Sequence, residues 1–508
     1  MKPYSKQLIA WDKKYAWHPF TQMRDWIRDD GALVIERGQG SYLIDSDGRR
    51  YLDGVSSLWC NTHGHRVPVI DRAVKRQLGK IAHSTYLGLA NEPASILSKE
   101  LIGIAPKGLT KVFYSDSGSE AVEIALKMAY QYWQLKGVKT KRTFLKFTNA
   151  YHGDTVGSVS VGGIQLFHDI FGPLLFKTFA AAAPYRYRDN FEGSEDAYAK
   201  FCADRVEREL KRHHRQIAAI VLEPLAQGAA GMLTQPKGFL KRVAALAKKY
   251  NTLLILDEVA TGFGRTGTMF ACEQEGVNPD LLCLAKGLTA GYLPLAATLA
   301  TDKIYNAFLG RYDEFKTFFH GHTYTANPLA CAAAVANLKY FKEKRVLHRA
   351  QGQIRLLTQE LKKIEPHPNV GEIRQVGMMV GIELVQDKAT RNPFKVEAQI
   401  GAKVCKEARK YGILIRPLGN VIVLMPPFCF TEAQIMKLCS GVYRAIKVVL
   451  RAEELAFEGL FARRGVPAEE CKGASARYLR PRASGSVLRG QVLLPAGRGQ
   501  VSSRRSKA

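Results

Sequence analysis

Residues 253–258 read LLILDE and residues 281–287 read LLCLAKG. Short runs of this kind, bounded by polar residues, are typical of strands buried on both faces of a parallel sheet. Asp257 ends the first run and Lys286 ends the second, 29 positions later, about the length of one strand–crossover–strand unit. If the two strands are parallel neighbours, both side chains leave the sheet at the edge where open α/β sheets bind ligands.

A buried aspartate beside a buried lysine has two interpretations. A structural ion pair is the more common one for a pair met without other context. The alternative is a pyridoxal phosphate (PLP) site, where the lysine forms a Schiff base with the cofactor and the aspartate keeps the pyridine nitrogen protonated. The second interpretation requires a cradle for the cofactor's phosphate elsewhere in the chain.

The chain supplies a helix start that suits an anion. Ser117 and Glu120 match a capping box, and the run AVEIALKMAYQYW behind them is amphipathic and rich in good helix formers. Gly118 and Ser119 would present free backbone N–H groups and a hydroxyl to a phosphate. Capping alone explains Ser117, so ordinary helix initiation stays open. Tyr151, which follows another strand-like run, can stack on a flat cofactor or pack in the core.

Composition places the chain among globular proteins. Its 508 residues allow two or three domains, its apolar fraction of 46% is ordinary, and no stretch holds 18 uninterrupted apolar residues, so we expect no membrane span. Residues 1–17 are polar and lack the apolar core of a secretion signal. The nine cysteines are scattered without a Cys-x-x-Cys pair, which favours reduced thiols. We therefore expect a cytoplasmic protein.

A net charge of +28 raises the question of nucleic-acid binding. Its distribution argues against that function. After Glu470 the chain has nine basic and no acidic residues, and other basic residues form small groups, such as 139–142 and 212–215, that usually mark solvated faces. We expect no nucleic-acid partner. We also expect no metal site, because His63 and His65 have no carboxylate or cysteine at ligand spacing nearby.

Residues 262–267 read GFGRTG and match the G-x-G-x-x-G pattern of dinucleotide-binding folds. That pattern should open a helix packed closely on its strand, but residues 268–270 start no helical pattern. Asp257 and Glu258 would also place two negative charges beside the pyrophosphate. Dinucleotide binding is therefore the weaker interpretation.

Strand-like runs alternate with helical stretches from about residue 110 to 300, which indicates an α/β domain with a mainly parallel sheet. Further helices and strands follow, with the pattern of a smaller α+β domain. After these the chain becomes rich in Arg, Gly, Ser and Ala, which favours disorder. We expect an N-terminal segment of residues 1–65, a large domain of residues 66–335, a small domain of residues 336–450 and a basic, disordered tail of residues 451–508.

Nine blocks in this order resemble the class III, fold-type I, PLP-dependent aminotransferases, over about residues 11 to 450. They are WHPFTQM, DGVSSLWCNTHGH, SDSGSEAVEIALKMAYQYW, NAYHGDTVGSVSVG, EPLAQGAAGM, DEVATGFGRTG, LAKGLTAGYLPL, FFHGHTYTANPLAC and IRPLGN. The resemblance implies the α/β fold of that family, with PLP as cofactor.

The resemblance implies a role for each matched residue of the cofactor site. Lys286 is similar to the lysine that binds PLP covalently, and Asp257 to the partner of the pyridine nitrogen. Gly118 and Ser119 are similar to the phosphate cradle. Tyr151 is similar to the catalytic-site ring that stacks on the cofactor.

Other matched residues fall on positions that the family uses for substrate or for the dimer. Arg416 is similar to an arginine that receives the substrate's carboxylate. A loop across the dimer supplies cofactor and substrate contacts in the family, and the matching residues are Gly321, His322 and Thr323. The remaining expected substrate-binding residues are Phe20, Leu58, Trp59, Asp154 and Arg265. Phe20, Leu58 and Val423 depart from the commoner family residues, which leaves the amino donor open.

The resemblance is greatest to members that convert 8-amino-7-oxononanoate to 7,8-diaminononanoate. It implies a homodimer with shared active sites that takes a small-molecule amino donor and a keto acceptor, with S-adenosylmethionine as the expected donor. Lysine as donor, and another ω-amine aminotransferase, stay open as alternatives. A nucleic-acid-binding protein is the alternative from a different class.

Overall fold

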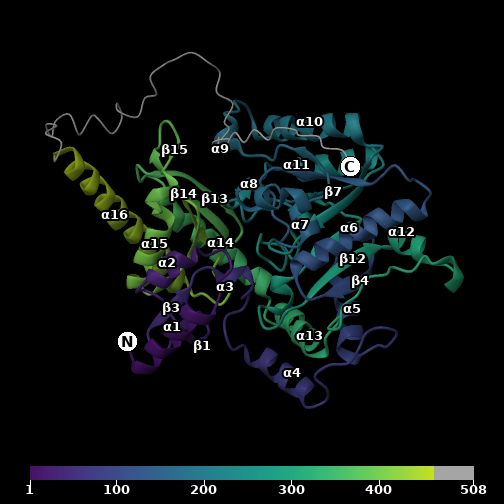
Figure 1. Ribbon diagram of the computed structural model, residues 1–508, viewed down its shortest axis with the longest axis horizontal. Helices are drawn as coiled ribbons and strands as arrows, with labels where there is room; N and C mark the ends of the chain where they lie inside the picture. The colour runs from purple at the N-terminus through teal and green to yellow at the C-terminus, as the bar shows by residue number, and fades with distance from the viewer. Residues whose placement is uncertain (463–508) are drawn as a thin grey trace, which may run out of the picture. The chain divides into compact units, whose positions relative to one another are not determined.

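The largest sheet in the computed structural model has seven strands (Figure 1). The structure describes residues 1–462. In spatial order the strands are β4 (Leu109–Ser115), β12 (Ala296–Thr301), β11 (Leu281–Leu284), β10 (Leu253–Asp257), β7 (Ile217–Leu222), β5 (Thr143–Phe147) and β6 (Phe179–Ala181). Only β12 runs antiparallel to its neighbours in this sheet. The mainly parallel α/β sheet expected from the sequence is confirmed.

The central strands β7, β10 and β11 are buried along their whole length. Their side chains alternate between the two faces, as the two-residue period of a strand requires. Leu253 and Ile255 join the core beneath α6 (Gly118–Leu135). Leu254 and Leu256 join the core with α10 (Glu195–His213) and α11 (Phe239–Lys249) on the other face. Two covered faces explain why the strands read as continuous apolar runs.

Strands β10 and β11 are parallel neighbours, with Asp257 opposite Cys283 in the register. Asp257 therefore ends its strand at the same edge at which β11 delivers Lys286. The chain between them forms turns and the short 3-10 helix η2 (Ala271–Glu275), so the GFGRTG motif opens no helix.

The described residues form three further sheets, the smallest of which pairs β8 (Ala226–Gln227) with β9 (Leu233–Thr234). A four-stranded sheet joins β1 (Ile35–Gln39), β2 (Tyr42–Asp45), β3 (Arg50–Asp53) and β16 (Ile413–Leu414). A five-stranded sheet holds β13 (Val370–Val376), β14 (Met379–Asp387), β18 (Val421–Leu424), β17 (Arg416–Leu418) and β15 (Asn392–Pro393). Because β3 pairs with β16, the N-terminal segment is joined to the C-terminal region by backbone hydrogen bonds.

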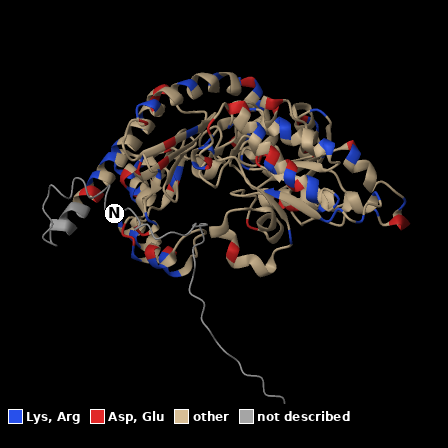
Figure 2. Cartoon of the chain, turned by 90° about the horizontal axis from the view of Figure 1, so that it is seen from above, with Lys and Arg blue, Asp and Glu red and all other residues tan. Residues whose placement is uncertain are grey.

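The other α-helices of the described residues range from 4 to 31 residues in length. They are α1 (Pro3–Tyr15), α2 (Met23–Arg28), α3 (Ser56–Trp59), α4 (Pro68–Leu78), α5 (Glu92–Ile104), α7 (Val156–Val161), α8 (Gln165–His168), α9 (Arg186–Asp189), α12 (Asp302–Tyr305), α13 (Pro328–Glu343), α14 (Val346–Lys362), α15 (Ile400–Ala408) and α16 (Glu432–Ala462). None of the helices among residues 1–462 combines the length and the apolar character that a membrane crossing needs. Figure 2 shows basic and acidic residues interleaved over this part of the chain.

Two expected boundaries fall inside helices. The boundary between residues 335 and 336 falls inside α13, so a continuous helix joins the two regions there. The tail was expected from residue 451, but α16 continues to Ala462. Residues Met1–Ala452 form one compact unit. The rest of the expected tail, residues 463–508, lies outside the described residues, and the division into a large and a small domain stays a prediction.

Candidate active site

A cavity of about 400 Å³ lies at the carboxyl edge of the seven-stranded sheet. Three parallel strands deliver polar side chains to this edge: β10 ends in Asp257, Glu223 follows β7, and Lys286 comes two residues after β11. The cavity is lined, among others, by Trp59, Asp116, Ser117, Gly118, Ser119, Tyr151, His152, Gly153, Glu223, Asp257 and Lys286. Six predicted site residues therefore come together here: Trp59, Gly118, Ser119, Tyr151, Asp257 and Lys286.

Lys286 follows β11 and starts the short 3-10 helix η3 (Lys286–Thr289) with a left-handed backbone (φ 42°). Its ammonium nitrogen lies 5.1 Å from the centroid of the Trp59 ring. Burial lowers the pKa of Lys286, while Asp257 and Glu223 act in the opposite direction. Among residues 1–462 the structure gives this ammonium group no hydrogen-bond acceptor. The lysine thus presents an amine that loses its proton more readily than an exposed one.

Asp257 is buried at the end of β10 and is held from two sides. His152 Nδ1 donates to its Oδ2 at 2.7 Å, and the Val259 backbone N–H donates to its Oδ1 at 3.0 Å. The other ring nitrogen of His152 is buried without a hydrogen-bond partner among the described residues. A carboxylate fixed in this way offers a preorganised acceptor to a cationic ring nitrogen.

The first turn of α6 forms the anion cradle. Glu120 N–H donates to Ser117 Oγ at 3.3 Å, and the Glu120 carboxylate accepts from the backbone N–H groups of Asp116 and Ser117. The capping box is therefore confirmed. The N–H groups of Gly118 and Ser119 precede the intrahelical bonds and stay available to an anion. A Cβ at Gly118 would meet Val259 Cγ1 at 2.7 Å, so glycine lets the cradle pack against the Asp257 strand end.

Tyr151 and Asp154 lie beside this cradle. The Tyr151 hydroxyl donates to Asp154 Oδ2 at 2.7 Å, and burial together with this hydrogen bond raises the pKa of the phenol. Asp154 N–H donates to Ser119 Oγ at 3.2 Å. Gly153 (φ 118°) leaves no room for a side chain, because a Cβ there would lie 1.9 Å from Ser119 Oγ. Asp154 thus supports Tyr151 from outside the cavity lining.

Glu223 is a site residue that sequence reasoning missed. It follows β7, is buried, and accepts from Tyr151 N–H at 3.1 Å and from Gly228 N–H at 2.9 Å. Burial raises the pKa of its carboxyl to about 7. The available signal was a carboxylate directly after the apolar run of residues 217–222, the same pattern that drew attention to Asp257. His152, the partner of Asp257, was missed too.

Several predicted substrate residues lie outside the cavity lining. Phe20 is exposed and meets Phe167 edge-on at 5.2 Å, and Leu58 is 51% exposed. Arg265 is buried and donates to the carbonyl oxygens of Asn61 and Pro426. Arg416 is exposed on β17. The structure of the single chain does not bring these side chains to the cavity, and their predicted roles in substrate binding stay predictions.

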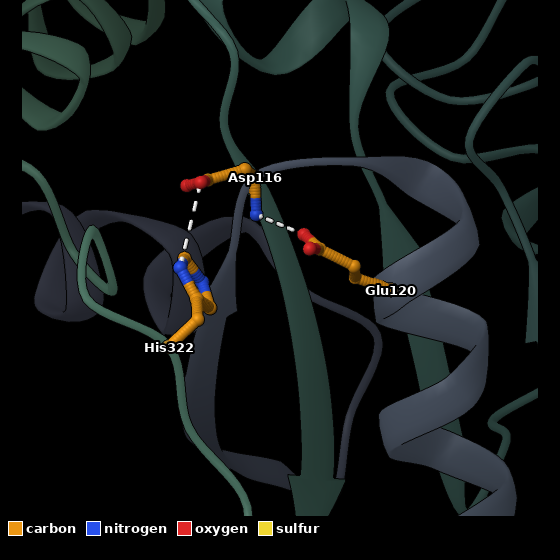
Figure 3. A group of neighbouring side chains, drawn as sticks. All are labelled: Asp116, Glu120 and His322. Atoms are coloured by element: carbon orange, nitrogen blue, oxygen red, sulfur yellow. Dashed lines mark hydrogen bonds and ion pairs between the residues drawn. The ribbon is translucent and has the colours of Figure 1, made fainter. Parts of the chain in front are cut away.

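The predicted dimer loop is also outside the lining. Gly321 and Thr323 are exposed, and His322 Nδ1 lies 3.4 Å from Asp116 Oδ2. Figure 3 shows His322 facing Asp116, with Glu120 on the first turn of α6. The three side chains are close enough to share a cation. However, Glu120 already accepts two backbone hydrogen bonds at the helix start, so helix capping and one ion pair account for the group.

Comparisons with known proteins agree with this arrangement. The family model "Aminotransferase class-III" matches residues 27–446. The adenosylmethionine-8-amino-7-oxononanoate aminotransferase of Geobacter sulfurreducens is 51% identical over 451 residues, which is 88% of this chain and 99% of that protein.

Two solved structures are similar over the same part of the chain. The adenosylmethionine-8-amino-7-oxononanoate aminotransferase of Methanocaldococcus jannaschii has a TM-score of 0.83 and 48% identity, covering 87% of this chain and 99% of that one. The omega transaminase from Pseudomonas jessenii in complex with PMP has a TM-score of 0.84 and 30% identity, covering 87% and 98%. This chain belongs to the class-III aminotransferases, a family of PLP-dependent enzymes.

Proposed function

We propose that this chain transfers an amino group from S-adenosylmethionine to 8-amino-7-oxononanoate and so forms 7,8-diaminononanoate, a step of biotin synthesis. The observation that carries the proposal is the cavity that joins Lys286, Asp257 and the α6 cradle. The choice of substrates rests on the relatives, two of which carry that activity in their names and are 51% and 48% identical to this chain.

The residues present fit PLP. The free N–H groups of Gly118 and Ser119 suit its phosphate, Asp257 suits a protonated ring nitrogen, and Tyr151 offers an aromatic face. Lys286 supplies the amine that the cofactor's aldehyde requires. When bound, PLP accepts the amino group and withdraws electrons from the substrate carbon that carries it.

Each residue of the chain then has a physical task. Lys286 takes a proton from the donor carbon and returns one to the acceptor, because burial keeps its amine available as a base. Asp257, oriented by His152, holds the ring nitrogen in its charged form. Trp59 covers Lys286 and excludes water from that side of the cavity.

We further propose that the enzyme acts as a homodimer in the cytoplasm. The loop with Gly321, His322 and Thr323 lies outside the cavity of its own chain. In a dimer, this loop would contribute to the active site of the other subunit. All eight cysteines among the described residues are free, which suits a reducing compartment. Arg416 is the arginine that we assign to the carboxylate of the substrate, and Arg265 is assigned only to the surroundings of the substrate.

A second candidate is transfer from another amine, with lysine or an ω-amine as donor. The structure of an omega transaminase at 30% identity has the same fold. Phe20, Leu58 and Val423 are less polar than the family residues that they replace, and Val423 packs in one apolar cluster with Trp59. An aliphatic stem packs well against such a surface.

Titration of the PLP-loaded protein with each donor decides between the candidates. We expect S-adenosylmethionine to bleach the visible absorbance of the cofactor, and 8-amino-7-oxononanoate to restore it with formation of 7,8-diaminononanoate. Bleaching by lysine alone would favour the lysine-dependent reaction. Failure of 8-amino-7-oxononanoate to restore the absorbance would contradict the proposed acceptor.

A further inference from the structure

The turn that carries Trp59 into the cavity has an unusual backbone. Ser56, Ser57 and Trp59 all have positive φ angles, of 51°, 60° and 65°, although none of them is glycine. Leu58 between them has a negative φ and is neither helical nor extended (φ −139°, ψ 66°). L-residues rarely adopt positive φ, and a cluster of them persists only where surrounding contacts hold it. The conformation of this turn (residues 56–59) is therefore maintained by contacts with the surrounding residues.

The held conformation decides where two large side chains point. Leu58 is 51% exposed, whereas the neighbouring Trp59 is 7% exposed and lines the cavity. The indole lies between Lys286, whose ammonium is 5.1 Å from the ring, and Gly228, where a Cβ would lie 3.1 Å from Trp59 Cζ3. If residues 56–59 lost their positive φ angles, the indole ring would move out of the space between Lys286 and Gly228. The backbone of the turn thus sets one wall of the cavity.

Asp53, at the end of β3, accepts two hydrogen bonds from the turn, both from Ser57. It is fully buried, and its Oδ1 accepts from Ser57 N–H at 2.7 Å while its Oδ2 accepts from Ser57 Oγ–H at 2.9 Å. His65 Nε2 lies 3.1 Å from the same Oδ2. Burial acts to raise the pKa of Asp53, but hydrogen bonds from His65 and Ser57 outweigh it and keep the pKa below its ordinary value. Asp53 is thus anionic beneath the turn.

Two contacts fix the turn from the opposite side. Ser56 Oγ–H donates to the Met425 carbonyl at 2.6 Å. Arg265, from the GFGRTG motif, donates to the Asn61 carbonyl at 3.1 Å and approaches the Trp59 carbonyl at 3.5 Å. The turn is therefore clamped between the end of β3 and the segment that follows β18.

We propose that Asp53, with His65 behind it, is a positioning residue that holds Trp59 against Lys286 and thereby sets which amino donors the cavity accepts. The inference rests on the proposed function, because it assigns donor binding to this cavity. An indole held rigidly beside the amine site gives a flat face for a large cationic donor. If the indole were mobile, the cavity would select less well among amino donors, while Lys286 and the residues that contact the cofactor would keep their positions.

The test uses the PLP-loaded enzyme with three variants. Asp53→Asn keeps the shape of the side chain but removes the anion, and Ser57→Gly removes the Oγ contact and the need to hold a positive φ. Asp45→Asn is the matched control, because Asp45 is also buried, ends the neighbouring strand β2 and holds the turn at residues 46–49, outside the cavity lining.

For Asp53→Asn and Ser57→Gly we expect the KM of S-adenosylmethionine to rise about tenfold or more, with the maximum rate and the cofactor spectrum nearly unchanged. Asp45→Asn should lower Tm and leave KM unchanged. The variant Trp59→Leu should also raise the KM of S-adenosylmethionine. In the double variant, Asp53→Asn should raise this KM little further, because both changes act through the same ring.

The opposite results overturn the proposal. Additive effects of Asp53→Asn and Trp59→Leu, or an unchanged KM in both turn variants, would show that Asp53 is only structural. If Asp53→Asn does not fold, Ser57→Gly carries the test alone. A wild-type enzyme that turns over another amine but not S-adenosylmethionine contradicts the proposed function; the same KM comparison is then made with that amine.

Discussion

Lys141 and Lys286 lie at opposite edges of the seven-stranded sheet. Both lie near an indole ring and have a lowered pKa, but they differ in the hydrogen bonds that their ammonium groups make. Lys141, at the amino edge, lies 4.6 Å from the ring of Trp133, as Lys286 at the carboxyl edge lies 5.1 Å from the ring of Trp59. Burial lowers the pKa of both, for Lys141 to about 8. Neither burial nor an indole neighbour therefore separates a reactive lysine from a structural one.

The difference lies in what the ammonium groups bind. Lys141 donates to the carbonyls of His214 and Ile217, each at 2.9 Å, and to Thr252 Oγ1 at 3.4 Å. Its three protons are used, and it ties the starts of β7 and β10 together. Lys286 has no such acceptor among residues 1–462 and faces a cavity. A buried lysine whose ammonium group donates no hydrogen bond to the protein is available for chemistry. One whose three N–H groups all donate hydrogen bonds has a structural role.

Replacing Lys286 with alanine gives the largest expected effect. We expect transamination to fall by on the order of a thousandfold or more, because both the nucleophile and the proton carrier are lost. Tm and far-UV circular dichroism should stay close to wild type. A variant that interconverts the cofactor forms at the native rate would remove Lys286 from its proposed role.

Asp257→Asn should slow the reaction by at least about tenfold, since a neutral amide holds a ring nitrogen in its charged form less well. Single-turnover rates measure this effect, and absorbance of the bound cofactor shows whether binding persists. A smaller loss would mean that Asp257 serves mainly as the partner of His152.

Lys141→Met should change the catalytic rates less than about twofold but destabilise the protein by about 2 kcal/mol, because two buried carbonyl groups lose a donor. Denaturant unfolding and steady-state rates on the same sample provide the comparison with Lys286→Ala. A large loss of activity in a stable Lys141→Met variant would break the distinction between the two lysines.

The smallest expected effect is a pH dependence of stability from Lys141. Its folded pKa of about 8 lies below its ordinary value of 10.5, so the unfolded chain binds more protons between these two pH values. The free energy of unfolding contributed by Lys141 should therefore rise as pH rises from 8 to 10.5. Comparing the pH slopes of wild type and Lys141→Met measures this contribution. Equal slopes would contradict it.

The sequence was sufficient to predict those elements of the structure that local residue patterns determine. Apolar runs predicted the buried strands β10 and β11, and the capping box predicted the start of α6. These features depend on residues close together in the chain. The order of the strands in the sheet, rather than closeness along the chain, brings Asp257, Lys286 and the cradle into one cavity.

Other features depend on contacts that no local pattern encodes. The positive φ angles of Ser56, Ser57 and Trp59 are held in part by Met425, in the segment after β18, which is distant in sequence. Arg265 turns toward backbone carbonyls for the same reason. Arg416 and the loop of residues 321–323 lie outside the cavity of the single chain.

The central claim is that Lys286, and not another buried lysine, carries the cofactor. Reduction of the PLP-loaded protein with borohydride, followed by proteolysis and mass spectrometry, would locate the attached pyridoxyl group. We predict one modified lysine at Lys286, with Lys141 unmodified. A pyridoxyl group on Lys141 or on any other lysine, with Lys286 free, would contradict the account.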